Sequence, residues 1–440
     1  MTIPISGPIA TLAATSRRAL VIKSLDAAAS SVSLFTKLYP DAAIAVASHA
    51  DAMHAAGVPA PSPLAGLPVS IKDLFDVAGE ATQAGSLVLK DAPPASSDAP
   101  AVQRLRAAGA AIIGKTNMTE FAFSGIGLNP HYGTPVNPAD DHVARIPGGS
   151  SSGAAVSVAA GICVASLGSD TGGSVRIPAA LCGVVGFKPT ARRVPTLGAL
   201  PLSTTLDSIG AITRSVADCI LLDGILASAA LNIRDLPLAA FHLLIPSTLM
   251  MDDLEPHVAT SFAHALSILS AAGARITEAP LALLADSTAL NKFSAIEAFA
   301  WHRRLLEAHE ELYDRRVAKR IKLGAQMLAV DYIDMHAARR AWINGVEAEL
   351  MPYDAMIMPT VPTVAPPIAE LEASDDMFFA ANSRMLRNCS AINLLDGCAI
   401  SLPCHATGSL PVGLMVAGPA LHDGEVLAVA RAIELALKQQ

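Results

Sequence analysis

Short apolar segments typical of strands alternate with helical segments along nearly the whole chain, and this alternation constrains the fold most. LPVSIKD (67–73), AAIIGK (110–115) and CVASLGSD (163–170) are typical of buried strands. Residues 98–109 and 154–162 are typical of helices. Strands that alternate with helices pack in layers, with helices against a sheet. The sequence therefore predicts an α/β fold with a mostly parallel or mixed sheet.

The same alternation continues on both sides of this region. The further predictions are helices over 8–60, 213–230, 255–273 and 423–438, and strands at the start of 354–367 and within 409–418. Pro-, Gly- and Ser-rich pieces lie between periodic segments, and we see no repeat and no flexible linker. We therefore expect a single domain over 1–440, with the helices of 1–60 packing on its core.

Composition limits the partners that we expect. The chain is 52% hydrophobic and 16% charged, so it can bury a large core. Its net charge is −8 and no long basic run occurs, which disfavours nucleic acid as a partner because phosphate binding needs a positive face. We see no secretory signal and no run of about 18 strongly apolar residues, so no membrane partner is expected. A soluble cytoplasmic protein is the expectation.

Cysteines and histidines do not form familiar metal or disulfide motifs. The six cysteines include no C-x-x-C pair and most lie in apolar surroundings, so we expect buried free thiols. The twelve histidines form no H-E-x-x-H, and no glycine-rich nucleotide motif occurs. The residues therefore suggest no metal and no organic cofactor.

Two Gly/Ser clusters are the candidates for chemistry: PGGSSSG (147–153) and SDTGGSVRIP (169–178). In both, turn glycines let backbone N–H groups approach a ligand, with hydroxyl groups beside them. The second cluster follows an apolar strand, which is where ligands bind in α/β sheets. Its consecutive amides, from Thr171 to Ser174, could form an oxyanion hole.

A nucleophilic serine needs a base, and one arrangement would use the first cluster. Ser151 fits the G-x-S-x-G pattern of a nucleophile elbow. His405 or His422 could then supply the base downstream. From the residues alone this interpretation stays open.

A Ser–Lys arrangement is the second solution. Lys72 stands at the end of an apolar strand, where burial would lower its pKa. A base that works near neutrality needs a lowering of about 3 units from about 10.4. The structural alternative is an ion pair of Lys72 with Asp73 or Asp76.

The order of the motifs is more specific than any one of them. They are GLPVSIKDLFDVAGEATQAGS (66–86), GKTNMTEFAFSG (114–125), GTPVNP (133–138), GGSSSGAAVSVAAGICVASLGSDTGGSVRIPAALCGVVGFKPT (148–190), LDSIGAITRSVAD (206–218), YDAMIMPTVPTVAPP (353–367) and LPVGLMVAG (410–418). In these motifs the chain resembles the amidase signature hydrolases along nearly its whole length. The resemblance implies the fold of that family, a large mixed central sheet covered by helices on both faces, with catalytic core motifs over 66–218.

The resemblance also implies a Ser–cis-Ser–Lys triad. The base of the family falls on Lys72, its bridging serine on Ser150 and its nucleophile on Ser174, with a non-proline cis peptide before Ser150. The oxyanion-hole amides fall on Thr171, Gly172, Gly173 and Ser174. No metal or organic cofactor is implied.

Other positions follow from the same resemblance as supporting or substrate-contacting residues. Asp170 and Arg176 are expected to form a charge pair that braces the turn, and Ser151 to hydrogen-bond Lys72. The expected substrate contacts are Phe123, Gly125 and Ile126 in the loop 121–133. Arg339 and Asp423 are added because they fall near the positions at which the glutaminase subunit of the aminoacyl-tRNA amidotransferase holds the α-groups of glutamine. Asp423 could instead cap the helix that follows it.

The implied activity is hydrolysis of a small-molecule amide to an acid and ammonia or an amine. The partly apolar loop 121–133 weakly favours an aliphatic or aryl amide. The family includes stand-alone amidases and the glutaminase subunit of the aminoacyl-tRNA amidotransferase. We favour the stand-alone enzyme, which could be a homodimer, and the alternative that we keep is the amidotransferase subunit.

Overall fold

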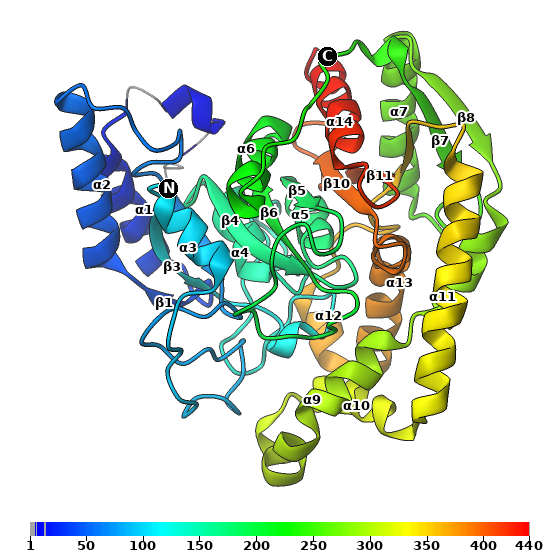
Figure 1. Ribbon diagram of the computed structural model, residues 1–440, viewed down its shortest axis with the longest axis horizontal. Helices are drawn as coiled ribbons and strands as arrows, with labels where there is room; N and C mark the ends of the chain where they lie inside the picture. Colours follow the sequence, from blue (N-terminus) through cyan, green and yellow to red (C-terminus); the bar gives the residue numbers. More distant parts are fainter. Residues whose placement is uncertain (1–4, 6, 13–14, 440) are drawn as a thin grey trace.

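The computed structural model describes residues 5, 7–12 and 15–439. Within them, eleven strands form one mixed sheet in the order β1-β3-β2-β4-β6-β5-β10-β11-β9-β7-β8. Helices pack against the sheet along its length (Figure 1). The chain thus has the α/β class that the sequence predicts, and the mixed rather than the mostly parallel form of the sheet.

The bounds of the elements are as follows. The strands are β1 (Phe35–Leu38), β2 (Pro68–Lys72), β3 (Ala111–Thr116), β4 (Ala165–Asp170), β5 (Val185–Lys188), β6 (Ser208–Thr213), β7 (His242–Pro246), β8 (Arg275–Ala279), β9 (Ala355–Pro359), β10 (Cys398–Pro403) and β11 (Gly413–Gly418). The α-helices are α1 (Arg17–Ala29), α2 (Pro40–Ala55), α3 (Pro100–Ala107), α4 (Ser152–Ala159), α5 (Arg176–Cys182), α6 (Val216–Ala227), α7 (Pro256–Ala271), α8 (Ser287–Leu290), α9 (Phe293–His309), α10 (Arg315–Lys322), α11 (Ala329–Leu350), α12 (Ile368–Ala373), α13 (Asp375–Leu394) and α14 (Asp423–Lys438). Short 3₁₀ helices are η1 (Ile9–Leu12), η2 (Glu120–Ala122), η3 (Leu238–Ala240), η4 (Ala282–Asp286), η5 (Glu310–Leu312) and η6 (Leu323–Gln326).

The strands predicted around the Gly/Ser clusters are confirmed as β2, β3 and β4. β2 lies between the other two and runs parallel to both. All three strands are buried along their whole length, which explains their nearly continuous apolar sequences. Because parallel strands end at the same edge of a sheet, Lys72 at the end of β2 lies near the end of β4.

The prediction that residues 8–60 are helical is wrong for one segment. FTKL (35–38) forms β1, which pairs antiparallel with β3 at the edge of the sheet. The strand has only four residues, is only partly buried and lies between α1 and α2. So short a segment carries too little alternation to stand out from its helical neighbours.

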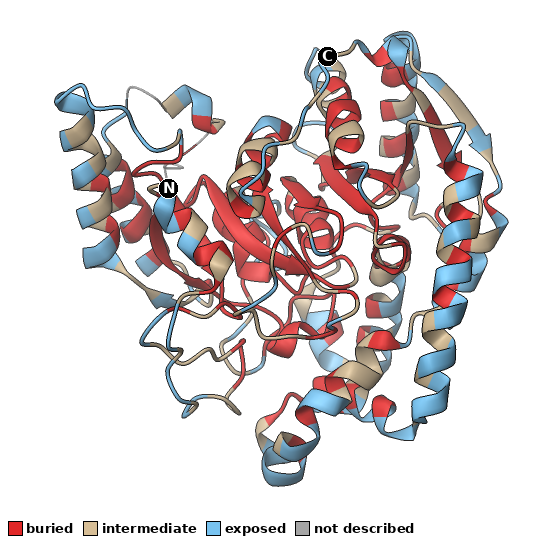
Figure 2. Cartoon of the chain, viewed as in Figure 1, coloured by how far each residue is buried: buried red, intermediate tan, exposed pale blue. Residues whose placement is uncertain are grey.

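The buried residues occupy the sheet and the inner faces of the helices (Figure 2). All six cysteines are free and buried, as the sequence predicts. None of the described helices combines the length and the apolar character needed to cross a membrane.

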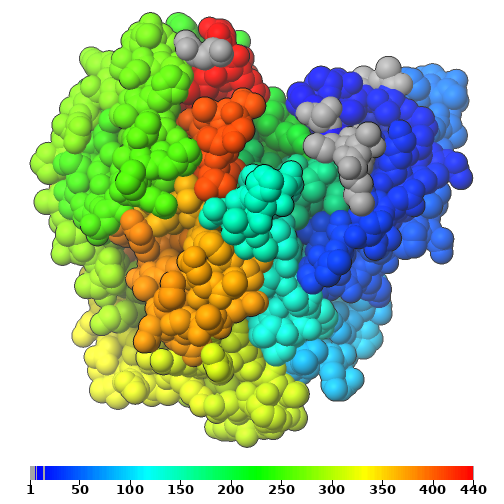
Figure 3. Space-filling view, turned by 180° about the vertical axis from the view of Figure 1, so that it is seen from behind, coloured from blue at the N-terminus to red at the C-terminus, as the bar shows by residue number. Residues whose placement is uncertain are grey.

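Segments distant in sequence meet on one face of the molecule. The turquoise segment near residue 140 lies beside the orange one near residue 365 (Figure 3). Arg145 Nη1 donates to the carbonyl of Ala365 at 2.8 Å, and the Ile146 N–H donates to the carbonyl of Pro366 at 3.1 Å. These contacts hold the C-terminal third against the loop that leads into PGGSSSG.

Candidate active site

Lys72 is the last residue of β2, and its side chain is fully buried. Its Nζ lies 2.7 Å from Ser150 Oγ and 2.8 Å from Ser169 Oγ. Asp73, the neighbour that could have paired with it, faces Lys115 instead, at 3.8 Å. Lys72 therefore does not form the ion pair with Asp73 that was the structural alternative. The Lys72 amine contacts two hydroxyl groups instead.

Burial lowers the pKa of Lys72 to about 7, from an ordinary value of 10.5. The negative charges of Asp170 and Asp207 act in the opposite direction and keep the pKa from falling further. A buried ammonium loses its hydration, so the neutral amine is favoured. Lys72 can therefore accept a proton near neutral pH.

The loop before α4 presents Ser150 to this amine. The peptide bond between Gly149 and Ser150 is cis, as the resemblance implies. The Thr119 N–H donates to the carbonyl of Ser150 at 3.1 Å, and the Gly149 N–H to that of Gly125 at 2.8 Å. Ser150 is itself fully buried, so its hydroxyl group is held in place beside Lys72.

Ser151 does not make the expected hydrogen bond with Lys72. Its hydroxyl group donates to the carbonyl of Ser169 at 3.3 Å. No hydrogen bond among the described residues joins Ser151 to His405 or His422, so the nucleophile-elbow arrangement is absent. The reason is that Ser151 stands at the N-cap position of α4, where its side chain turns toward β4.

Ser169 takes the place expected of Ser151 beside Lys72, and no sequence motif had pointed to a role for Ser169. Its Oγ is the second partner of Lys72 Nζ, and its carbonyl lies 3.5 Å from the same atom. Ser169 is the penultimate residue of β4 and belongs to the motif SDTGGS. Ser169 lies at the end of β4, and Lys72 lies at the end of β2. Because β2 and β4 are parallel neighbours, their ends meet at one edge of the sheet, and this pairing could have predicted the contact.

The turn after β4 is organised by the Asp170 carboxylate. The carboxylate accepts from the Gly173 N–H at 2.8 Å and from the Val175 N–H at 3.1 Å. Gly173 has φ +126°, and a Cβ there would lie 2.6 Å from the Cβ of Cys389. Glycine is therefore required at this position, both for the backbone conformation and for space.

The Gly173 N–H donates to Asp170, so it is not available to an oxyanion. The expected oxyanion hole of four donors is thereby reduced to three. Thr171, Gly172 and Ser174 line the adjoining cavity, whereas Gly173 does not. No hydrogen bond from the backbone N–H of Thr171, Gly172 or Ser174 is found among the described residues. Three of the four expected donors are thus free to hold a ligand oxygen, and the fourth shapes the turn.

Ser174 follows these amides and is nearly buried. Its carbonyl accepts from the Ser151 N–H at 3.2 Å, which ties the turn to the loop carrying Ser150. No hydrogen bond engages its hydroxyl group among the described residues. The fold therefore brings Lys72, Ser150 and Ser174 into one region, from β2, the loop before α4 and the turn after β4.

The charge pair predicted between Asp170 and Arg176 is present and fully buried. Arg176 Nη2 lies 2.9 Å from Asp170 Oδ1, and Nε lies 3.0 Å from Oδ2. Asn393 on α13 donates to the same carboxylate at 2.9 Å. Burial is the largest single influence and would raise the pKa of Asp170. The charge and hydrogen bonds of Arg176, the charge of Lys188 and the hydrogen bond from Asn393 together outweigh it and hold that pKa far below its ordinary range.

Replacing Arg176 by methionine should destabilise the fold strongly. It would leave the Asp170 carboxylate buried without its counter-charge, and removing one partner of a buried pair costs about 3–5 kcal/mol. We expect a clearly lower unfolding midpoint in urea. Arg315→Met is the matched control: its pair with Asp375 is 2.8 Å long but Arg315 is 74% exposed, so about 1 kcal/mol or less is expected. Equal midpoint shifts in the two variants would contradict this role.

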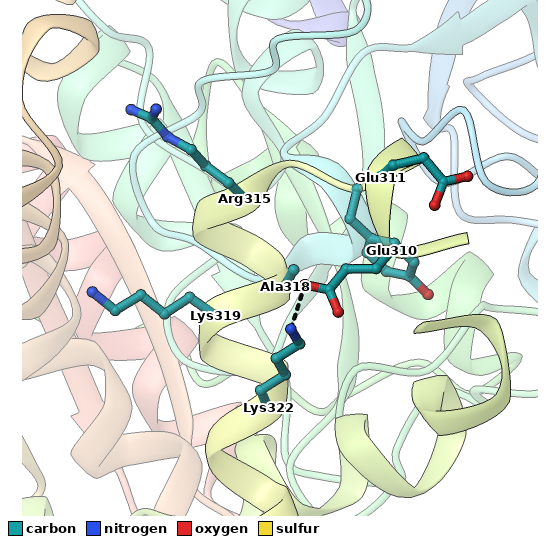
Figure 4. A pocket seen from close by; sticks show the side chains of 7 residues that line it. Glu310, Glu311, Arg315, Ala318, Lys319 and Lys322 are labelled. Atoms are coloured by element: carbon teal, nitrogen blue, oxygen red, sulfur yellow. Dashed lines mark hydrogen bonds and ion pairs between the residues drawn. The ribbon is translucent and has the colours of Figure 1, made fainter. Parts of the chain in front are cut away.

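A cavity of about 1100 Å³ opens in front of Ser174. Its walls come from the turn 171–174, from Phe123 after η2, and from α9, α10 and α13. The size suits a small-molecule substrate, since ligand pockets are typically about 300–1,000 Å³. A second cavity, of about 650 Å³, lies between η5 and α10 and is lined mainly by charged side chains (Figure 4).

Of the expected substrate contacts in the loop 121–133, only Phe123 lines the cavity at Ser174. Ile126 is fully buried in a core cluster with Ile177 and Leu181. Gly125 donates its N–H to Asn382 Oδ1 at 2.8 Å and is packed against Leu386. The chain leaves the cavity surface after Ser124, so Gly125 and Ile126 support the cavity wall rather than form its surface.

Arg339 and Asp423 do not reach the cavity either. Arg339 Nε donates to the carbonyl of Leu394 at 2.8 Å, and its Nη2 pairs with Asp396 at 2.7 Å. Asp423 accepts from the N–H and the hydroxyl group of Thr190, at 2.8 and 2.6 Å. The expected alternative, that Asp423 caps α14, is also wrong: His422 is the N-cap residue, Asp423 is the first residue of the helix, and its carboxylate binds Thr190 instead of a helix N–H.

Known proteins share the sequence pattern and the fold of this chain. The model of the family described as Amidase matches residues 19–427. A 2-amino-5-chloromuconic acid deaminase from Comamonas testosteroni is 34% identical over 391 residues, which cover 86% of this chain and 83% of the relative. A glutamyl-tRNA(Gln) amidotransferase subunit from Nitratidesulfovibrio vulgaris (strain DP4) is 34% identical over 438 residues, covering 89% of this chain and 88% of that protein.

The solved structures are similar over almost the whole chain. A crystal structure of an amidase has a TM-score of 0.86 and 34% identity, with 97% of both chains covered. A protein whose complex is described as revealing the origins of an s-triazine catabolic enzyme has the same TM-score at 28% identity, again with 97% of both chains covered. The chain belongs to the Amidase family, the amidase signature hydrolases, and is an enzyme that acts on amide C–N bonds.

Proposed function

We propose that the protein hydrolyses a small carboxylic acid amide through an acyl-enzyme on Ser174. The observation that carries this proposal is the buried Lys72 amine, with a pKa of about 7, at 2.7 Å from Ser150 Oγ. A neutral lysine linked to a serine is one of the known means of activating a nucleophilic serine.

In the proposed first step, neutral Lys72 takes a proton from Ser150 while Ser150 takes one from Ser174. Ser174 Oγ then attacks the amide carbonyl carbon. The negative charge that develops on the oxygen is stabilised by the N–H groups of Thr171, Gly172 and Ser174, each worth about 3–4 kcal/mol in comparable sites.

In the second step the proton returns through Ser150 to the leaving nitrogen, so that ammonia or an amine departs. Water then attacks the acyl-enzyme, with Lys72 and Ser150 again moving the proton. Ser169 keeps the Lys72 amine oriented by its hydrogen bond of 2.8 Å.

A stand-alone amidase is the function that we favour. The alternative is the glutaminase subunit of a tRNA amidotransferase, which is supported by the relatives at 32–34% identity. Against it, the two residues expected to bind the α-groups of glutamine, Arg339 and Asp423, have other partners. The C. testosteroni relative is named as a deaminase of an amino-substituted muconic acid, which supports a reaction that releases ammonia from a small molecule.

The test is an ammonia-release assay with the purified chain alone. The panel holds aliphatic, aryl, amino-acid and dicarboxylic monoamides, glutamine and 2-amino-5-chloromuconic acid. We expect release of ammonia from at least one amide without a partner protein. If only glutamine is hydrolysed, and only after amidotransferase partner proteins are added, the protein is the glutaminase subunit. If 2-amino-5-chloromuconic acid is the only compound turned over, the reaction is deamination and not amide hydrolysis.

A further inference from the structure

The cavity at Ser174 has a strongly positive wall. Its described lining residues include Lys292, Arg320, Arg384 and Arg387 but no aspartate and no glutamate. The whole chain has a net charge of −8, so the positive cavity is a local feature. Clefts lined by one sign of charge concentrate ligands of the opposite sign. The cavity therefore favours an anionic substrate over a neutral one.

Two of these cations are already engaged with the loop after β7. Arg387 Nη2 donates to the carbonyl of Asp252 at 2.6 Å, and its Nε donates to Asn388 Oδ1 at 3.1 Å. Arg384 Nη2 donates to the carbonyl of Asp253. These two side chains hold that loop against α13.

Arg320 differs from them because its guanidinium has no acidic partner among the described residues. No hydrogen bond or ion pair of its side chain occurs in that part of the chain. Its neighbour Arg316 pairs with Asp375 at 2.7 Å, and Lys322 pairs with Glu310. Buried or half-buried charges in proteins are usually paired. Arg320 is thus a cation held in the cavity wall without its counter-charge.

The aromatic ring of Phe123 supports the Arg320 guanidinium. The guanidinium carbon lies 4.5 Å from the centre of the ring, and both side chains line the cavity at Ser174. Stacking on a ring fixes the plane of the guanidinium and leaves the N–H groups at its edge available as donors. Burial lowers the pKa of Arg320 to about 10, so the group still carries its charge at neutral pH.

We propose that Arg320, stacked on Phe123, binds a carboxylate of the substrate, so that the enzyme acts on amides that carry a second, ionised carboxyl group. The planar guanidinium fork matches a carboxylate with two parallel hydrogen bonds. Because Ser174 and Arg320 lie on different elements of one cavity, the carboxylate and the scissile amide stand at separate points of the substrate. The proposal rests on the amidase function proposed above. An amide with a second carboxylate takes the place of the aliphatic or aryl amide that the loop 121–133 favours as the expected substrate.

The test compares matched substrates. Monoamides of straight-chain dicarboxylic acids with about four to six carbons are assayed beside monocarboxamides of the same length. We expect kcat/KM to favour the carboxylate-bearing amides by about 30-fold to 1,000-fold, the range for one desolvated charge pair. Arg320→Met should remove this preference through a higher KM for the carboxylate-bearing amides, and kcat/KM for the neutral amides should fall much less.

Lys319→Met is the matched control. Lys319 is the preceding residue on α10 and also stands over an aromatic ring, that of Phe379, at 4.8 Å. Lys319 lines the other cavity, between η5 and α10, and is not among the residues that line the cavity at Ser174, whereas its ring partner Phe379 is. In Figure 4 its side chain extends away from Glu310 and Glu311. The variant removes the same charge from the same helix and should keep the preference. Arg320→Lys, which retains the charge but not the planar fork, should keep part of it.

The outcomes separate the two proposals. If the wild-type enzyme hydrolyses neutral and carboxylate-bearing amides with equal kcat/KM, the proposed role of Arg320 is refuted, while the amidase function still holds. Equal loss toward both substrate types in Arg320→Met, with an unchanged melting temperature, also overturns it. If no amide of either type is hydrolysed, the proposed function itself fails.

Discussion

Ser174→Ala is expected to abolish amide hydrolysis while the protein stays folded. The substitution removes one oxygen at the cavity surface, where no hydrogen bond engages the hydroxyl group among the described residues, so its cost in stability should be small. Loss of the nucleophile in a serine hydrolase lowers kcat by about 10⁴-fold to 10⁶-fold. Steady-state ammonia release and a melting curve, measured on the same sample, check both statements.

A fluorophosphonate probe gives a second and independent measurement. It should label wild-type protein at Ser174, and Ser174→Ala should stay unlabelled. Ser152→Ala is the matched control, because Ser152 Oγ donates to the carbonyl of Asn117, at 3.3 Å, and has no hydrogen bond to Lys72, Ser150 or Ser174 among the described residues. Labelling at Ser151, or turnover retained by Ser174→Ala, would refute the assignment of the nucleophile.

Lys72→Met is expected to have the next largest effect. Methionine nearly preserves the volume of the fully buried side chain but cannot accept a proton from Ser150. A lost general base costs about 10²-fold to 10⁴-fold, and more where the residues act as a unit. We expect kcat/KM to fall by at least about 10³-fold. Lys115→Met is the control for activity, since Lys115 is also buried and its pairing with Asp73 places it outside the proposed relay. Because this variant leaves Asp73 buried without its partner, kcat/KM of both variants is compared on the fraction that a melting curve shows to be folded.

The pH dependence of the wild-type enzyme tests the same residue without a mutation. Only neutral Lys72 can act as the base, and the neutral form predominates above its pKa of about 7. Below that pH, kcat/KM should therefore fall about tenfold per pH unit, and above it a plateau should follow. Burial raises the pKa of Asp207 to about 6, against the lowering effect of the hydrogen bond that it accepts from Thr171, so Asp207 titrates in the lower part of this range. A profile that keeps rising toward about pH 10 would mean that the lysine retains its ordinary pKa and would count against the mechanism.

Much of the fold could be predicted from local pattern. The strands 67–73, 110–115 and 163–170 and the helices 98–109 and 154–162 occur in the structure with both ends close to the expected ones. Their patterns were long and strongly apolar, which makes such segments easy to identify. β1 was missed because four half-exposed residues between two helices give no such pattern.

The candidate site also has a part that the sequence predicts and a part that it does not. Lys72, Ser150 and Ser174 were found because each belongs to a motif whose order along the chain is specific. The partners of these residues could not be found by that means. Ser169 rather than Ser151 contacts Lys72, and Gly173 donates its N–H to Asp170, because those contacts depend on side-chain directions at strand ends and in a tight turn.

The sequence by itself determined the α/β class, the position of the reactive lysine at a strand end and the two Gly/Ser clusters, because these depend on neighbours along the chain. The tertiary structure alone decided what surrounds them. It buried Lys72 deeply enough to lower its pKa to about 7, removed Arg339 and Asp423 from the cavity, and brought Arg320 from α10 against Phe123. Burial, charge pairing and the lining of a cavity are set by residues far apart in the sequence, and no local pattern records which of them meet.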